Sequence, residues 1–142
     1  MQPDAADWTV YSVGEPHAPI VLDSGFRIES LGKLTLSGYA KLMQETYAGI
    51  SLMVSPHPSY PPLEMSTFGI RTLTNCYANK DLTGFNDNIV SLSSYAPEDV
   101  ARALCRICDD YTPVRKASVN AAYCSDRDMW QHILPELCRN WK

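Results

Sequence analysis

Hydrophobic and polar residues alternate over two segments of the second half of the chain, residues 89–92 and 116–123. This period of two predicts strands with one face toward a core. Between them, apolar side chains recur at helical spacing and make one stripe: Val100, Leu104, Ile107 and Cys108. The helix is expected to begin at Pro97, a favoured first helical residue, and to end before Pro113. This strand–helix–strand unit is the predicted structural centre.

The N-terminal half contains shorter apolar runs separated by turn residues. Residues 8–13 predict a first strand, and residues 20–22 and 26–31 flank an Asp-Ser-Gly turn that favours a hairpin. Leu36 to Gly49 predicts a helix, because its apolar residues fall on one face. Ser37 is the expected N-cap of this helix, and Gly49 is placed to end it.

The middle of the chain is less periodic. Residues 50–54 are either a buried strand or a continuation of the preceding helix. Residues 55–62 contain four prolines, which predict an extended surface loop in place of a helix or a central strand. Such a loop is either a rigid connector or a recognition element anchored by Tyr60. Residues 68–73 predict a strand, and residues 75–88 are polar and rich in turn residues.

The C-terminal segment has a capping-box-like start at Ser125 and a broad apolar face interrupted by Pro135. It predicts a kinked helix, or two short helices, packed over the sheet. Taken together, the elements indicate an α+β fold with a mixed or mostly antiparallel sheet of about four to six strands and two to three helices. Residues 1–7 are expected to be a flexible tail, and residues 8–142 a single domain.

Composition narrows the possible partners. The net charge is −4, and no basic patch occurs in the sequence, so we expect no nucleic-acid partner. No segment approaches the roughly 20 apolar residues that cross a bilayer, and we expect no membrane partner. The N-terminus has neither a basic start nor an apolar core, which disfavours a secretory signal and predicts a cytoplasmic protein.

The cysteines and histidines are the natural candidates for metal binding or catalysis. Cys105 and Cys108 form a C-x-x-C inside the predicted helix, where a thiolate gains little from the helix dipole. Zinc binding would need further ligands, and the candidates are Cys124, Cys138 and His132. Buried structural thiols are the preferred interpretation. The remaining histidines, His17 and His57, lie among prolines without a local nucleophile signature. We therefore expect no catalytic residue, no metal and no cofactor.

Asp109 and Asp110 stand at the C-terminal end of the predicted helix, where negative charge meets the negative end of the dipole. They either cap the following turn or form an exposed acidic corner with Asp87 or Asp81, suited to a basic partner. This corner is one candidate surface for binding a partner.

The loop carrying His57 and Tyr60 is the other candidate surface.

Residues 68–123 also carry a family resemblance. Asn88, a short apolar strand, a helix opened by Pro97, then Asp110-Tyr111-Thr112-Pro113 and an alternating strand form an order similar to that of bacterial polymorphic-toxin immunity proteins of the immunity protein 52 type. The Tyr111-Thr112 pair departs from the Trp-Asp pair expected before the proline. The resemblance implies a small cytosolic α+β protein that neutralises a cognate toxin, often one delivered by a type VI system.

Two other classes of function stay open. The chain could be a small enzyme that uses a cysteine or a histidine, or a structural accessory protein of a phage or secretion system. A toxin inhibitor needs shape, aromatic anchors and complementary charge but no catalytic group, which is why it is preferred. The sequence does not indicate an oligomeric state.

Overall fold

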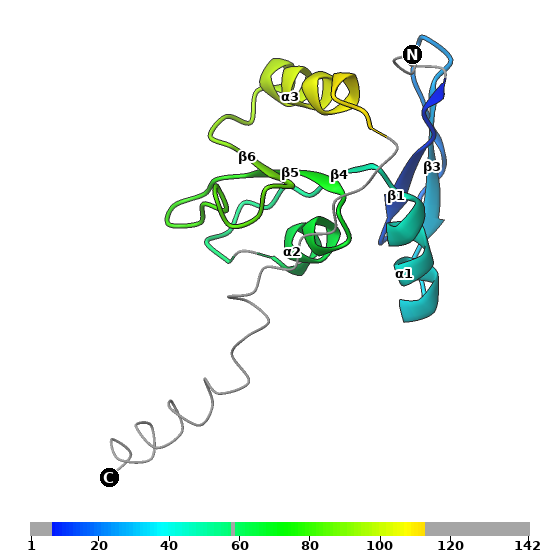
Figure 1. Ribbon diagram of the computed structural model, residues 1–142. Helices are drawn as coiled ribbons and strands as arrows, with labels where there is room; N and C mark the ends of the chain where they lie inside the picture. Colours follow the sequence, from blue (N-terminus) through cyan, green and yellow to red (C-terminus); the bar gives the residue numbers. More distant parts are fainter. Residues whose placement is uncertain (1–6, 58, 113–142) are drawn as a thin grey trace.

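The computed structural model describes residues 7–57 and 59–112. Its first sheet has three strands in the order β1-β3-β2 (Figure 1). Strand β1 (Val10–Val13) pairs in parallel with β3 (Arg27–Gly32), and β2 (Ile20–Val21) pairs antiparallel with β3. The predicted hairpin between residues 20–22 and 26–31 is confirmed.

The second sheet is entirely parallel, with the strand order β4-β5-β6. It consists of β4 (Ala48–Ile50), β5 (Arg71–Asn75) and β6 (Ile89–Leu92). Within the described residues, parallel pairings outnumber antiparallel ones by three to one. The α+β class with mixed pairing is confirmed. However, the strands form two three-stranded sheets in place of one larger sheet, and antiparallel pairing does not predominate.

Helices cover both faces of the second sheet. Helix α2 (Tyr60–Thr67) and helix α3 (Pro97–Asp109) lie on opposite faces of β4-β5-β6 (Figure 1). Such covering is the expected arrangement for parallel strands, because the crossover connections place helices on the faces of the sheet. Helix α1 (Leu36–Glu45) connects β3 of the first sheet to β4 of the second.

The core includes two small apolar clusters, and Leu73 of β5 and Ile107 of α3 are buried as well. Met43 of α1 packs with Met65 and Ile70, and this cluster joins α1 to α2 and to the start of β5. Leu63 packs with Leu82 and Ile89 in the other cluster, on the side of β6. The two clusters together tie α2 into the fold from both of its sides.

An aromatic group connects the two sheets. The ring of Trp8, two residues before β1, lies 5.7 Å from the ring of Tyr47, immediately before β4. Tyr111, just after α3, packs against both rings, at 5.7 Å from Trp8 and 4.8 Å from Tyr47. The starts of β1 and β4 therefore lie together, and we call this group the aromatic latch.

The first predicted helix is correct in its start and wrong in its caps. Its N-cap is Thr35, whose side-chain oxygen accepts a hydrogen bond from the Gly38 N–H at 3.1 Å, in place of the predicted Ser37. The helix ends at Glu45 with Thr46 as its C-cap, and Gly49 lies in the middle of β4. The chain thus leaves the helix early enough for residues 48–50 to pair with β5.

The proline-rich segment differs most from its prediction. Residues 55–62 were expected to be extended throughout, yet α2 begins at Tyr60 and places Pro61 and Pro62 in its first turn. Proline is tolerated there, because the first N–H groups of a helix have no intrahelical acceptor. As a consequence, the predicted strand at residues 68–73 begins only at Arg71 and runs to Asn75.

The strongest predicted elements are confirmed. Strand β6 has the predicted bounds, and α3 begins at Pro97 and ends before Pro113. The predicted strand at 116–123 and the C-terminal helical segment lie outside the described residues, as does most of the predicted tail at 1–7. Within the described residues, no helix is long and apolar enough to cross a bilayer.

Candidate functional site

The parallel strands end beside a surface hollow of about 220 Å³. Its lining includes Gly14, which follows β1, and Lys33, which follows β3. Thr35 and Leu36 at the start of α1, and Tyr39 one turn later, complete the wall that the helix provides. In open sheets with parallel strands, ligands bind outside the carboxyl ends of the strands. The hollow occupies such a position and is the principal candidate site.

The start of α1 offers two backbone donors to this hollow. The side chain of Thr35 satisfies the N–H of Gly38. Within the described residues, the N–H groups of Leu36 and Ser37 have no hydrogen-bond acceptor. Free N–H groups and the positive end of the helix dipole together favour an anion at a helix start. Lys33 adds a full positive charge at the same place.

Tyr39 connects the hollow to α2. Burial and the carboxylate of Glu64, which accepts a hydrogen bond from the Tyr39 hydroxyl group, raise the pKa of this tyrosine to about 12. Glu64 lies in the middle of α2 and is exposed. Lys33 therefore lines the hollow with a positive charge, and the carboxylate of Glu64 lies next to Tyr39, another lining residue.

A second polar group lies at the carboxyl ends of β4 and β5. The buried side chain of Asn75, the last residue of β5, accepts a hydrogen bond from the Met53 N–H at 2.7 Å and donates one to the Met53 carbonyl oxygen at 3.1 Å. Its amide nitrogen also donates to the Cys76 carbonyl and to the Tyr95 hydroxyl, both at 2.9 Å. Lys80 donates from Nζ to the Met53 carbonyl oxygen at 2.9 Å. These contacts hold the segment after β4 against β5.

The start of α2 has an unusual backbone. Ser59, its N-cap, has a φ of 68° and makes no side-chain capping hydrogen bond. Its N–H donates to Nδ1 of His57 at 3.0 Å, and the rings of His57 and Tyr60 are 6.0 Å apart. A positive φ is rare outside glycine and costs energy, so these contacts stabilise a strained turn.

The predicted partner surfaces lie at opposite ends of the second sheet. His57 and Tyr60 follow the carboxyl end of β4. Asp109 and Asp110 end α3 at the amino end, where the Tyr47 hydroxyl donates to the Asp110 carbonyl oxygen at 3.1 Å.

Asp87 and Asp81, the other two acids predicted for the partner surface, lie apart from each other. Asp87 precedes β6 at the amino end of the sheet, and its carbonyl accepts a hydrogen bond from Arg71 at 2.8 Å. Asp81 lies elsewhere, because its side chain bonds with Thr83 and with the side chains of Cys76 and Ser91, and these contacts lower its pKa. The acidic corner therefore consists of Asp87, Asp109 and Asp110, and it includes the cation of Arg71.

The prediction of buried thiols holds only in part. Cys105 is exposed, because it lies on the outer side of α3, whereas Cys76 and Cys108 are half-buried. Burial raises the pKa of the Cys108 thiol, with smaller contributions from Cys105 and Asp109. Within the described residues no group of histidine, cysteine and acidic side chains could hold a metal ion. The proposed zinc ligands Cys124, Cys138 and His132 lie outside those residues.

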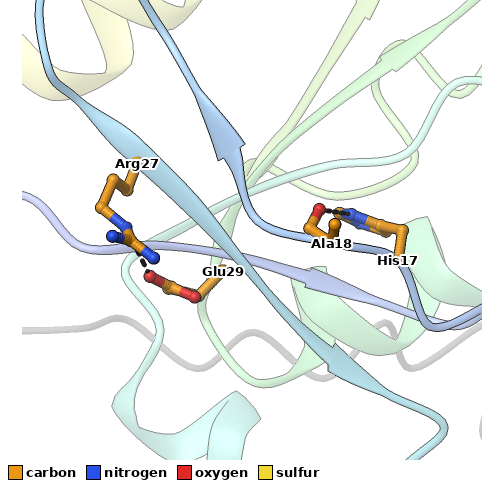
Figure 2. A network of polar contacts seen from close by, with 4 residues as sticks. All are labelled: His17, Ala18, Arg27 and Glu29. Atoms are coloured by element: carbon orange, nitrogen blue, oxygen red, sulfur yellow. Dashed lines mark hydrogen bonds and ion pairs between the residues drawn. The ribbon is translucent and has the colours of Figure 1, made fainter.

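A larger and shallower hollow, of about 530 Å³, lies beside the start of β3. Its lining includes Trp8, Phe26, Arg27 and Glu29, and the last two form an ion pair at 2.9 Å (Figure 2). His17 lies nearby in the view, with Nδ1 at 2.7 Å from the Ala18 carbonyl oxygen.

Sequence reasoning missed the principal site. Lys33, Tyr39, Glu64, Asn75 and Lys80 were not singled out, because each stands in an ordinary sequence context. One signal was available for Lys33: it lies between an alternating strand and a helix, which is where ligands bind in sheets with parallel strands. Glu64 was hidden because α2 was not predicted.

These features define an α+β domain with a polar hollow at the ends of the parallel strands of its first sheet. The chain belongs to the family described as WsaF, C-terminal domain, whose model matches residues 1–105. The match covers both sheets and most of α3. A comparison with curated proteins found no match. The family match does not bear on toxin neutralisation, and that hypothesis stays a prediction.

Proposed function

We propose that this domain binds a nucleotide-sugar at the carboxyl ends of its parallel strands, as part of a protein that transfers sugars. The family supports the proposal, since WsaF is a glycosyltransferase-associated protein. Glycosyl transfer commonly uses a sugar activated by a nucleoside diphosphate. A domain of such a protein therefore needs a place for two phosphates and for sugar hydroxyl groups.

The observation that carries the proposal is the hollow beside Lys33. Lys33 and Leu36 line this hollow, and the N–H groups of Leu36 and Ser37 at the start of α1 have no acceptor within the described residues. An ammonium group and such N–H groups favour a phosphate. The space around Gly14, which lines the hollow, is open, because a Cβ built there meets no atom within 4 Å. A diphosphate is thus matched in charge and in hydrogen-bond donors.

Glu64 supplies the complementary chemistry. Sugar and ribose hydroxyl groups donate hydrogen bonds, and a carboxylate accepts them strongly. Its hydrogen bond with Tyr39 uses one oxygen and leaves the other for a ligand. Lys33 for the phosphates and Glu64 for hydroxyl groups are therefore the assigned binding residues.

Calorimetric titration with a panel of nucleoside-diphosphate sugars tests the proposal. We expect binding by the wild-type chain and a loss of about tenfold or more in affinity for Lys33→Met, which removes the charge but keeps the length. Lys41→Met is the matched control, because Lys41 lies exposed on α1 and does not line the hollow. Equal losses in the two variants would place the ligand elsewhere, and no binding to any member of the panel would refute the proposal.

A second candidate is the neutralisation of a toxin through the acidic corner. The structure supports it in one respect, because Asp87, Asp109 and Asp110 lie at the same edge of the second sheet. Reversing the charges of Asp109 and Asp110 should slow association with a basic toxin more at low salt than at high salt. An association rate that does not change in either condition would remove this surface.

A further inference from the structure

The hollow beside the start of β3 lies at the amino ends of the parallel strands β1 and β3. Its volume of about 530 Å³ falls within the range of roughly 300–1,000 Å³ that is typical of ligand sites. Val10 pairs with Ile28, so the residues just before β1 lie beside the start of β3. The lining therefore combines the segment before β1 with the turn before β3 and the first residues of β3. The Lys33 hollow lies at the other end of the same two strands.

An ion pair supplies hydrogen-bonding groups to this hollow. Arg27 and Glu29 are two residues apart on β3, so their side chains project from the same face of the strand (Figure 2). Nε of Arg27 donates to Oε1 of Glu29 at 2.9 Å, and the two side chains are 57% and 41% exposed. This contact leaves the terminal nitrogens of the guanidinium group as donors and the second carboxylate oxygen as an acceptor for a ligand.

Two aromatic side chains supply the apolar part of the lining. Trp8 and Phe26 are both half-buried, and both line the hollow. The Trp8 ring packs against the rings of Tyr47 and Tyr111, each 5.7 Å away. An aromatic ring that is already held in place loses little freedom when a ligand binds to it, which favours binding.

The lining favours a neutral ligand with both polar and apolar surface. Arg27 and Glu29 neutralise each other, and the other lining residues carry no charge. An entirely apolar ligand would take the ion pair out of water without replacing its hydrogen bonds. A sugar ring satisfies both parts of the lining. Each hydroxyl group can donate to the carboxylate and accept from the guanidinium group, and the C–H groups of the ring can pack against aromatic side chains.

We infer that this hollow binds a neutral saccharide. Arg27 and Glu29 form hydrogen bonds with neighbouring hydroxyl groups of one sugar ring, and Trp8 and Phe26 pack against its C–H groups. The inference goes beyond the proposed function and does not rest on it, because the two hollows have no lining residue in common.

Ligand-observed NMR titration of the full chain with neutral oligosaccharides of glucose, galactose, mannose and N-acetylglucosamine tests the inference. We expect the wild type to bind at least one of them and Arg27→Met to bind it about tenfold more weakly, because the charged donors are gone. Arg102→Met is the matched control, since Arg102 forms an exposed ion pair with Asp99 on α3, at 3.3 Å, and does not line the hollow. Equal losses in the two variants, or no binding by the wild type, would overturn the inference.

Glu29→Met and Phe26→Leu test the two parts of the lining separately. The first should weaken saccharide binding by about tenfold, and the second, which removes the ring but keeps an apolar side chain, by about threefold. Urea midpoints of Arg27→Met and Glu29→Met should stay close to that of the wild type, because exposed ion pairs contribute little to stability. Binding that depends on Phe26 but on neither charged residue would show a merely apolar contact and would overturn the inference.

The saccharide inference and the proposed function fail separately. If nucleoside-diphosphate sugars bind the wild type but no free oligosaccharide does, the inference fails and the proposed function stands. If oligosaccharide binding depends on Arg27 and Glu29 but no nucleoside-diphosphate sugar binds, the proposed function fails and the inference stands. If neither kind of ligand binds the wild type, both fail.

Discussion

The hydroxyl group of Tyr39 on α1 donates a hydrogen bond to the carboxylate of Glu64 on α2. The two residues are far apart in sequence, and their contact connects the helix that follows the first sheet to a helix packed on the second. Tyr39 also lines the hollow next to Lys33. The contact thus places the carboxylate of Glu64 next to a tyrosine that lines the hollow.

The raised pKa of Tyr39 predicts that the free energy of unfolding decreases at alkaline pH. Because the pKa of Tyr39 is raised to about 12 in the folded chain, its contribution to stability is complete below pH 10 and is lost as the pH rises toward 12. We expect the ionisation of Tyr39 to lower the free energy of unfolding by about 1 kcal/mol after screening by solvent. In the Tyr39→Phe variant this decrease should be absent. Urea unfolding as a function of pH measures it.

Glu64→Gln is the matched control for this prediction. It keeps the shape of the side chain and removes the charge, so the pKa of Tyr39 should fall toward the ordinary value for tyrosine. The absorbance of tyrosinate, taken as the difference between Glu64→Gln and its Tyr39→Phe double variant, reports that pKa. A value that stays at about 12 would mean that burial alone raises it.

The Asn75 side chain is predicted to be a principal stabilising group of the second sheet. Asn75→Ala would leave the Met53 N–H without its acceptor, while the Met53 carbonyl oxygen would keep only its hydrogen bond from Lys80, at a cost of roughly 1–3 kcal/mol for the unsatisfied N–H. Asn75→Asp keeps the acceptor for the Met53 N–H but loses the two N–H donors of the amide nitrogen, which the Met53 and Cys76 carbonyl oxygens and the Tyr95 hydroxyl share. Urea unfolding should rank the wild type above both variants, and an alanine variant of wild-type stability would contradict this prediction.

The sequence predicted those elements whose signals are local. Helix α3 has Pro97 at its start and an apolar stripe along its length, and both features survive in the structure because they do not depend on distant residues. Strand β6 is recognisable for the same reason. The hairpin of β2 and β3 follows from the turn that separates them.

Helix α2 was missed because its burial is not periodic. Pro62, Leu63, Met65 and Ser66 are all buried, so its apolar residues do not form one stripe. Its prolines were interpreted as residues that prevent a helix, although the first turn of a helix accepts them.

The contacts of Tyr39 with Glu64 and of Met53 with Asn75 join distant segments, and no local pattern encodes them. The candidate site is built from such contacts, which explains why it was found only in the structure.

Gly49 is predicted to be required by packing. It lies in the middle of β4, and a Cβ at this position would collide with the sulfur of Met65 and lie 3.6 Å from Ile70. Because the colliding atoms belong to the flexible end of a methionine, which can shift, Gly49→Ala should destabilise the chain by about 1 kcal/mol. In a Met65→Ala background the same change should cost less, because the colliding side chain is gone. Equal costs in both backgrounds, measured by urea unfolding, would contradict the assigned contact.

The aromatic latch yields a prediction that links stability to binding. Tyr47 contributes a hydrogen bond to the Asp110 carbonyl and ring contacts with Trp8 and Tyr111, and burial raises its pKa. Tyr47→Phe removes only the hydrogen bond, at about 0.5–1.5 kcal/mol, whereas Tyr47→Ala also removes the ring and should cost about 2 kcal/mol or more. Urea unfolding distinguishes the two.

Tyr60→Ala is the control, since Tyr60 is 63% exposed and its loss should change stability by no more than about 0.5 kcal/mol. The latch holds the start of β1 beside the start of β4, and the carboxyl ends of β1 and β3 form the wall of the hollow. Tyr47→Ala should therefore also weaken ligand binding, although Tyr47 does not line the site. An affinity that is unchanged in a folded Tyr47→Ala variant would mean that the first sheet keeps its place without the latch.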